Sequence, residues 1–258
     1  MTFEFDGQKY TQAATHQQEW GVRLMAELDL RQDARILDLG CGDGLLTAQL
    51  AARVPQGFVL GLDASAGMVA AAQSRRQHNL KFEQMDISNL DFTDEFDLVF
   101  SNAALHWLKD HHRLLAAVYR SLKAGGQVRF NFAGEGNCAH FYRVVKAVMA
   151  QNEYTDYFCH FEWPWYMPPV DEYRSLVSQV PFSETRVWGE NADRYFPDTA
   201  AMVRWLDQPS LVPFLGQLPQ PHQVAFRQQV IDRMVEVSRQ PDGRCFEMFR
   251  RINLYAKK

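Results

Sequence analysis

The chain has 258 residues, 47% of them hydrophobic and 22% charged, which is an ordinary composition for a globular protein. This length is enough for one large domain, or for one domain with an elaborate cap. A net charge of −4 provides no basic surface for phosphates, so nucleic acid is not an expected partner. The apolar runs are short and interrupted, and the N-terminus lacks the basic flank and apolar run of a secretory signal, so we expect a cytoplasmic protein with no membrane partner.

The first half of the chain alternates short apolar runs with amphipathic stretches, which is typical of βαβ units around a parallel sheet. The pattern predicts helices over 12–30, 43–53, 65–78 and 110–122, with a turn over 123–126. The predicted strands cover 34–39, 57–62, 80–84, 96–101 and 127–132.

The alternation of short apolar runs with amphipathic stretches ends beyond Ala133. Residues 154–169 are rich in aromatic residues and prolines without a clean period, and we expect them either to form a lid or to pack in a core. Helices are predicted over 199–206 and 222–238, and a strand over 249–256. The expected fold is α/β, a Rossmann-like, doubly wound, mostly parallel seven-stranded sheet with a helical, aromatic-rich insertion in the C-terminal half.

We predict three functional parts along this fold: a core with its N-terminal helix over 1–137, a cap and substrate insertion with one sheet strand over 138–244, and a terminal strand returning to the sheet over 245–258. The cysteines, widely spaced, predict reduced thiols. Cys138 with His140, and Cys159 with His160, lack the spacing of a zinc site, so no metal is predicted.

The most specific segment runs from Ile36 to Gly44, where a predicted strand enters a loop with glycines at alternating positions. Glycines allow a ligand to approach the backbone, and the following helix offers free N–H groups at its N-terminus. The loop lies at the carboxyl end of its strand, where ligands bind in open α/β sheets. A glycine-rich turn with no ligand is the alternative interpretation.

Acidic residues follow the next two predicted strands. Asp63 is placed to accept both ribose hydroxyls of an adenosine, although it could instead cap the next helix. Asp86 could accept from an adenine amino group while Ile87 packs on the ring. The dinucleotide fingerprint G-x-G-x-x-G is not met, because Leu45 stands where its third glycine belongs, and this disfavours a dehydrogenase.

These residues resemble the class I S-adenosylmethionine-dependent methyltransferases over about residues 8–133. Segments 101–107 and 132–137 are similar to the trans-aconitate methyltransferase group and related small-carboxylate methyltransferases, and Tyr10 and Gln17 look like the N-terminal helix of malonyl-carrier-protein methyltransferases. The resemblance implies S-adenosyl-L-methionine as cofactor and S-adenosyl-L-homocysteine as product. The cofactor-binding residues it implies are Tyr10, Gln17, Gly40, Cys41, Gly42, Gly44, Asp63, Ala64, Met68, Asp86, Ile87 and Asn102.

The resemblance further implies a small-molecule acceptor beyond the fourth strand and favours a carboxylate oxygen. A carboxylate is already ionised and needs positioning more than a base. A hydroxyl or carbon acceptor would instead need a general base, for which His106 is the candidate; the alternative is that His106 only forms part of the pocket wall beside Trp107. The candidate substrate residues are Trp107, Glu135, Arg143 and Trp165, with Arg194, Arg204 and Arg250 as further cations for an anionic acceptor.

A cofactor-binding protein without catalytic activity is the alternative from a different class. The complete set of cofactor residues favours the enzyme. The sequence predicts no particular oligomeric state.

Overall fold

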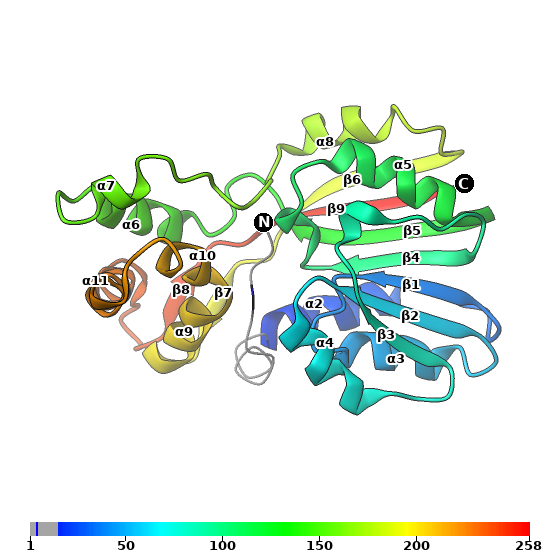
Figure 1. Ribbon diagram of the computed structural model, residues 1–258, viewed down its shortest axis with the longest axis horizontal. Coiled ribbons are helices and arrows are strands. Elements are labelled where there is room, and N and C mark those ends of the chain that lie inside the picture. The colour runs from blue at the N-terminus through cyan, green and yellow to red at the C-terminus, as the bar shows by residue number, and fades with distance from the viewer. Residues whose placement is uncertain (1–3, 5–14) are drawn as a thin grey trace. The chain divides into compact units, whose positions relative to one another are not determined.

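The computed structural model describes residue 4 and residues 15–258, which form two compact units. The sheet unit holds the described residues up to Glu135 together with Trp165–Glu190 and Arg251–Lys258. The helical unit holds Gly136–Pro164 and Asn191–Arg250 (Figure 1). The functional division into 1–137, 138–244 and 245–258 stays a prediction.

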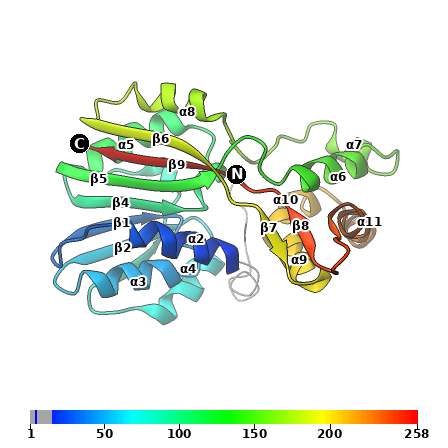
Figure 2. The same cartoon turned by 180° about the vertical axis from the view of Figure 1, so that it is seen from behind.

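The sheet unit is built on seven strands in the order β3-β2-β1-β4-β5-β9-β6 (Figure 2). The strands β1 to β5 pair in parallel, whereas β9 runs antiparallel to β5. Their bounds are β1 Arg35–Leu39, β2 Phe58–Asp63, β3 Leu80–Gln84, β4 Phe96–Asn102, β5 Leu122–Ala133, β6 Glu184–Asn191 and β9 Arg250–Lys257. The predicted Rossmann-like, mostly parallel seven-stranded sheet is confirmed.

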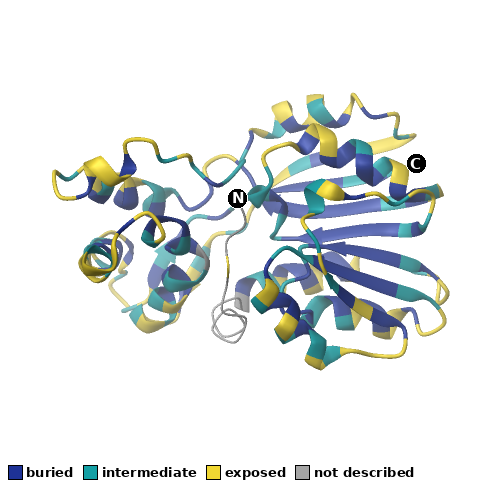
Figure 3. Ribbon diagram, in the orientation of Figure 1, coloured by how far each residue is buried: buried dark blue, intermediate teal, exposed yellow. Residues whose placement is uncertain are grey.

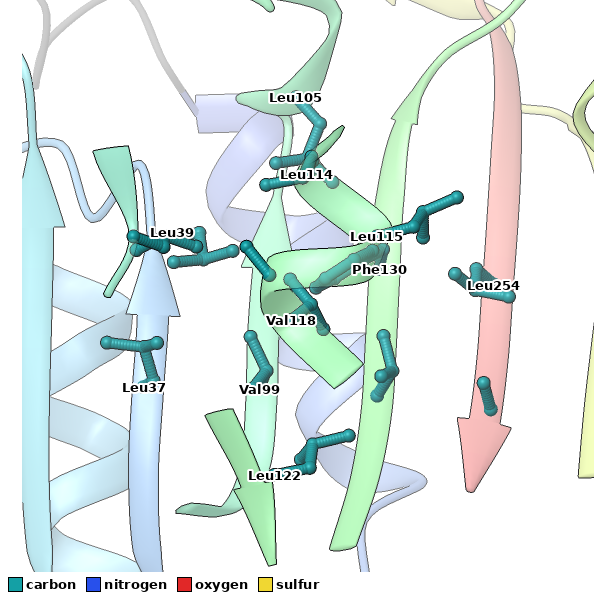
Figure 4. Close-up of a cluster of buried hydrophobic side chains, with 14 of the residues drawn as sticks. Leu37, Leu39, Val99, Leu105, Leu114, Leu115, Val118, Leu122, Phe130 and Leu254 are labelled. Carbon is teal, nitrogen blue, oxygen red and sulfur yellow. The ribbon is translucent and has the colours of Figure 1, made fainter. Parts of the chain in front are cut away.

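Helices cover both faces of this sheet, because strand residues alternate between two apolar clusters. Ile36 and Leu98 pack with α2 (Thr15–Ala26), α3 (Leu45–Arg53) and α4 (Ala66–Ala72) on one face. Leu37 and Val99 pack on the other face with α5 (His111–Ser121) and α8 (Val170–Val177), a cluster drawn in part in Figure 4. The central strands are therefore buried along most of their length (Figure 3).

Two predictions about local structure are wrong in detail. Residues 123–126, expected to form a turn, belong to β5. Leu122 pairs with Phe96 and the ladder resumes at Gln127 opposite Leu98, so the intervening residues form an irregularity within the strand rather than a break. The helix expected over 65–78 ends as α4 at Ala72 and continues only as the short 3₁₀ turn Gln73–Arg75.

The helical unit consists of α6 (Ala139–Met149), α7 (Thr155–Phe158), α9 (Thr199–Trp205), α10 (Val212–Leu215) and α11 (Gln220–Ser238). The helices predicted over 199–206 and 222–238 are thus confirmed as α9 and α11. A small antiparallel sheet of β7 (Arg194–Phe196) and β8 (Cys245–Glu247) was not predicted, because three-residue strands carry too little periodicity. Buried Glu247 accepts the backbone N–H groups of His140 and Phe141 and so caps α6.

The aromatic segment over 154–169 is divided between the two units. Tyr154 and Phe158 are buried in the helical unit, where their rings lie 5.1 and 5.4 Å from that of Phe226. This first part packs in a core, whereas Trp165 and Tyr166 belong to the sheet unit. Within residues 15–258, no helix combines the length and apolar character needed to cross a membrane.

Candidate functional site

The loop after β1 contains Gly40, Gly42 and Gly44, all with positive φ values of 71°, 55° and 76°. Glycine adopts this backbone region without the steric cost that a side chain would impose. The N–H groups of Gly40 and Cys41 donate to the Leu62 carbonyl at 2.8 and 2.9 Å, so the loop folds over the end of β2. The alternating glycines are therefore explained by the backbone path.

The three glycines differ in what surrounds them. A Cβ on Gly40 would lie 2.2 Å from the Cβ of Ala104, and one on Gly44 would lie 2.6 Å from the Phe82 ring. A Cβ on Gly42 would meet nothing within 4 Å. Gly40 and Gly44 thus permit close packing of the protein itself, while a side chain at Gly42 would enter open space.

Asp63 ends β2 and connects this loop to the next helix. Its Oδ2 accepts the Gly42 N–H at 2.9 Å and its Oδ1 accepts the Ser65 N–H at 3.0 Å. The N-cap of α4 is Ser65, whose Oγ accepts the N–H of Met68, so Asp63 is not that cap. Burial raises the pKa of Asp63, while the two N–H donors act in the opposite direction. Each carboxylate oxygen keeps capacity to accept a further hydrogen bond, as from a ribose diol.

A second carboxyl group lies in β1, two residues before Gly40, and was missed by the sequence analysis. Asp38 of β1 is buried, and its Oδ2 accepts the Thr47 hydroxyl at 2.7 Å. Burial and then the negative charge of Asp63 raise the pKa of Asp38 to about 7. The signal in the sequence that could have revealed Asp38 is an acidic residue inside an otherwise apolar strand. Burial also raises the pKa of the Cys41 thiol, which is therefore protonated at neutral pH.

The remaining predicted cofactor residues follow β2 and β3 or lie in α4. Asp86 is exposed, and its Oδ1 accepts the Ser88 N–H at 2.9 Å at the start of a 3₁₀ turn. Ile87 is partly buried against the main apolar cluster, and Met68 is buried in α4. The Ala64 carbonyl accepts the Gln84 amide at 3.1 Å. Their contact with a cofactor stays a prediction.

Asn102, at the end of β4, forms a hydrogen bond with Gln17 of α2, and the side chain of each residue has an acceptor oxygen that is not used. Its Nδ2 donates to the Gln17 carbonyl at 2.8 Å. The side-chain oxygens Oδ1 of Asn102 and Oε1 of Gln17 are buried with no hydrogen-bond partner in the described part of the chain. Buried acceptors of this kind favour a ligand that brings N–H donors, such as an ammonium group. Tyr10 lies outside the described residues.

His106 belongs to the 3₁₀ turn Leu105–Trp107 that follows β4. The residue as a whole is partly buried, and Nδ1 of its ring is buried with no hydrogen-bond partner among the described residues. Burial, followed by the positive charges of Arg251 and His111, lowers the pKa of His106 to about 3. The imidazole is therefore neutral at physiological pH.

Three of the four predicted substrate residues lie in or beside the segment Trp165–Pro168. Tyr166 N–H donates to the His106 carbonyl at 2.8 Å, and Glu135 N–H donates to the Pro168 carbonyl at 3.0 Å. The rings of Trp107 and Trp165 meet edge to face at 5.4 Å. Trp107, Glu135 and Trp165 consequently lie around one segment at the ends of β4 and β5.

The predicted cations belong to the helical unit, where Arg143 is exposed on α6 and Arg250 pairs with Asp193. The structure instead places Arg251 of β9 at the sheet. Its Nε donates to Asn131 Oδ1 at 2.8 Å, and its guanidinium carbon lies 4.4 Å from the Trp20 ring centroid. The sequence analysis missed it, because only the pairing of β9 with β5 brings it there.

Comparison with known proteins agrees with this geometry. Residues 36–126 match the family model described as a methyltransferase domain. The chain is 36% identical over 200 residues to a trans-aconitate 2-methyltransferase of Deinococcus radiodurans, covering 76% of each chain. It is 30% identical over 251 residues to the enzyme of that name from Variovorax paradoxus, covering 91% of each chain.

Solved structures share the fold at lower identity. The YcgJ protein from Bacillus subtilis superimposes with a TM-score of 0.63 at 18% identity, covering 93% of this chain and 98% of that one. Haemonchus contortus phosphoethanolamine N-methyltransferase 2, crystallised with S-adenosylhomocysteine, gives 0.59 at 19% identity, covering 93% and 52%. These likenesses show the fold. The match to the methyltransferase domain and the identity with the two trans-aconitate 2-methyltransferases establish that the chain belongs to the class I S-adenosylmethionine-dependent methyltransferases, with S-adenosylmethionine as its cofactor.

Proposed function

We propose that this methyltransferase acts on a carboxylate oxygen of a small polycarboxylate of the trans-aconitate type. The observation that carries the proposal is the neutral His106, whose pKa of about 3 makes it a poor base at the site where the acceptor is expected. The relatives named trans-aconitate 2-methyltransferase support the same acceptor class.

The cofactor residues are proposed from the geometry of the strand ends. The backbone at Gly42 borders the ligand space, and Asp63 accepts from the ribose hydroxyls. Asn102 and Gln17 accept from the ammonium group of the methionine moiety with their unused oxygens. The adenine end is assigned to residues that follow β2 and β3 and to one residue of α4: Ala64, Asp86 and Ile87, and Met68.

When bound, S-adenosylmethionine supplies an electrophilic methyl group on its sulfonium. A carboxylic acid with a pKa near about 4 is already ionised at neutral pH, so no side chain has to remove a proton from the acceptor. The chain's own contribution is then positioning and the exclusion of water. The edge-to-face pair of Trp107 and Trp165 provides an apolar wall for this purpose.

A hydroxyl or carbon acceptor would need a general base with a pKa near the working pH. His106 does not meet that requirement, and His111 is engaged by the Tyr173 hydroxyl and the Leu105 carbonyl. The geometry therefore favours the carboxylate over these alternatives.

The test is an assay for S-adenosylhomocysteine with trans-aconitate, its trimethyl ester, a phenol and an amine. We expect turnover with the free acid only and a product that mild alkali hydrolyses, as it does a methyl ester. Turnover restricted to the phenol or the amine would refute the carboxylate acceptor. Absence of turnover with all four compounds, despite tight cofactor binding, would favour a cofactor-binding protein without catalysis.

A further inference from the structure

A buried histidine bonds to the turn after β4 that carries His106. His111, the first residue of α5, is 1% exposed, and its Nε2 lies 3.0 Å from the Leu105 carbonyl oxygen. Its Nδ1 lies 3.2 Å from the hydroxyl of Tyr173, which is fully buried in α8. One imidazole thus joins the turn Leu105–Trp107 to two helices of the sheet unit.

The two bonds require one protonation state of His111. A carbonyl oxygen can only accept, so Nε2 carries a proton and donates to Leu105. Burial lowers the pKa of His111 to about 4, so the ring is neutral at physiological pH and Nδ1 has no proton. The Tyr173 hydroxyl therefore donates to Nδ1, and this bond stabilises the tautomer that directs Nε2–H at the turn.

The turn needs support because the backbone that leads into it is strained. Ala103 has a φ of 58°, in the left-handed region that is unfavourable for a residue with a side chain. Such a conformation persists only where the surrounding structure holds it. The Ala103 N–H donates to the Asn131 carbonyl of β5 at 2.7 Å, and two residues further on the Leu105 carbonyl accepts from His111. The strained backbone is therefore fixed at both ends.

The same histidine packs on the aromatic segment that is bonded to the turn. The rings of His111 and Tyr166 lie 4.8 Å apart, and the Tyr166 N–H donates to the His106 carbonyl. The chain neighbours of that bonded pair are Trp107 and Trp165, whose rings form the apolar wall proposed for the acceptor. A displaced turn would therefore displace the wall.

We propose that His111, oriented by Tyr173, positions the turn Leu105–Trp107 so that the acceptor lies in line with the methyl group. The inference rests on the proposed function, since the wall it supports is the one assigned to the acceptor. His111 is a positioning residue, which acts through the backbone of Leu105 and neither gains nor loses a proton. Misplacement of reacting atoms by about 1 Å can lower a rate about a hundredfold, so the bond to Leu105 should affect kcat more than cofactor affinity.

Two amide substitutions separate the two bonds of the ring. The glutamine Nε2 can take the place of the histidine Nε2, so His111→Gln keeps a donor for Leu105. The asparagine Oδ1 can take the place of Nδ1, so His111→Asn keeps an acceptor for Tyr173 but loses the donor to the turn. Both variants lose the packing of the ring, so urea unfolding should show destabilisation in both.

The assay measures kcat and KM for trans-aconitate, and calorimetry measures the affinity for S-adenosylhomocysteine. His111→Asn should lower kcat about ten- to a hundredfold and leave the cofactor affinity within about twofold of the parent. His111→Gln should recover kcat to within about fivefold of the parent, although its ring packing is also lost. A role in stability alone would give the two variants the same kcat.

Near-ultraviolet circular dichroism provides a second measurement that needs no acceptor, because it reports the packing of aromatic rings. His111→Asn should alter the tryptophan bands, since Trp107 and Trp165 lose their edge-to-face arrangement. The alteration should be smaller when the same substitution is made in Trp165→Phe. His111→Gln should resemble the parent in these bands.

Tyr173→Phe and Tyr119→Phe form a matched pair, since each removes one hydroxyl from a tyrosine of the apolar cluster around α5. Tyr173→Phe removes the donor to Nδ1, so its kcat should lie between those of the parent and His111→Asn. Tyr119 lies about two turns along α5 from His111, and Tyr119→Phe should leave kcat unaltered.

The outcomes distinguish this proposal from the proposed function. Parental kcat in His111→Asn, or equal losses in His111→Asn and His111→Gln, would overturn the positioning role while ester formation stands. If the parent methylates only the phenol or the amine, a loss with that acceptor in His111→Asn but not in His111→Gln would uphold the role and refute the carboxylate. A parent that turns over none of the compounds would refute both.

Discussion

Asp63 accepts the Gly42 N–H on Oδ2 at 2.9 Å, so the acid at the end of β2 fixes the conformation of the loop after β1. The same carboxylate accepts the Ser65 N–H and thereby also holds the start of α4. The residue expected to bind the ribose thus organises the two segments that border it.

The first prediction concerns Asp63→Ala. Each hydrogen bond to a charged group contributes about 1.5–3 kcal/mol, so losing two should weaken S-adenosylhomocysteine binding about a hundredfold or more. The melting temperature without ligand should fall as well, because Gly42 and Ser65 lose their acceptor. Calorimetry and thermal unfolding measure the two effects, with exposed Asp33→Ala as the control. Parental affinity in Asp63→Ala would mean that Asp63 only organises the loops.

The second prediction compares Gly42 with Gly44. Alanine at either position is strained by the positive φ, at a cost of roughly 1–2 kcal/mol. Gly44→Ala should cost more in urea unfolding, because its Cβ also meets the Phe82 ring. Gly42→Val should remain folded by circular dichroism but abolish S-adenosylhomocysteine binding, since its side chain fills the ligand space. Normal affinity in folded Gly42→Val would show that the loop does not contact the cofactor.

The glycine loop and Asp63 could be predicted because their signals are local: an apolar strand, alternating glycines and an acid after the next strand. Arg251 could not, since its position depends on the register between β5 and β9, which are far apart in the sequence. Arg250 and Arg251 are neighbours in the sequence, yet Arg250 pairs with Asp193 and Arg251 reaches Asn131. Successive strand residues point to opposite faces, and no pattern in the sequence reveals which of the two arginines reaches Asn131.

The third prediction concerns the side-chain oxygen of Asn102. Asn102→Leu keeps the approximate size of the side chain but removes the buried Oδ1 that has no partner in the described residues. If that oxygen accepts from the ammonium group, the variant should bind S-adenosylhomocysteine about tenfold more weakly, the loss expected for a bond to a charged donor. It should bind 5′-methylthioadenosine, which lacks the amino acid, as the parent does. Equal losses for both ligands would contradict the assignment.

The fourth prediction follows from the pKa of about 7 at Asp38. The folded protein keeps this proton up to about pH 7, whereas the unfolded chain releases it near the ordinary value of 3.8. The folded state therefore binds more protons between these values, and the contribution of Asp38 to the free energy of unfolding falls as pH rises through that range. Asp38→Asn, which can still accept from Thr47, should not show this contribution.

Urea unfolding of the parent and Asp38→Asn at pH 5 and pH 7.5 measures that difference. The parent should lose stability relative to the variant on going to the higher pH. If the parent and Asp38→Asn differ in free energy of unfolding by the same amount at pH 5 and pH 7.5, Asp38 is ionised in the folded state at both pH values.

The last prediction concerns His106, whose pKa of about 3 lies well below any pH at which the enzyme would be assayed. If the acceptor is a carboxylate, no proton leaves it during methyl transfer, and His106→Gln should cost only the positioning that the ring provides. The rate of the parent should then show no histidine ionisation between about pH 6 and pH 9, the range that spans an ordinary histidine pKa. Exposed His112→Gln, the same change on the neighbouring helix, should leave kcat unaltered.

A general base would instead contribute about 10²–10⁴-fold and would give a rate that rises with pH through its pKa. A loss in His106→Gln beyond roughly a hundredfold in kcat, together with disappearance of such a rising limb, would identify His106 as the base. The carboxylate acceptor would then have to be replaced by a hydroxyl or carbon acid, because only those acceptors need a proton removed.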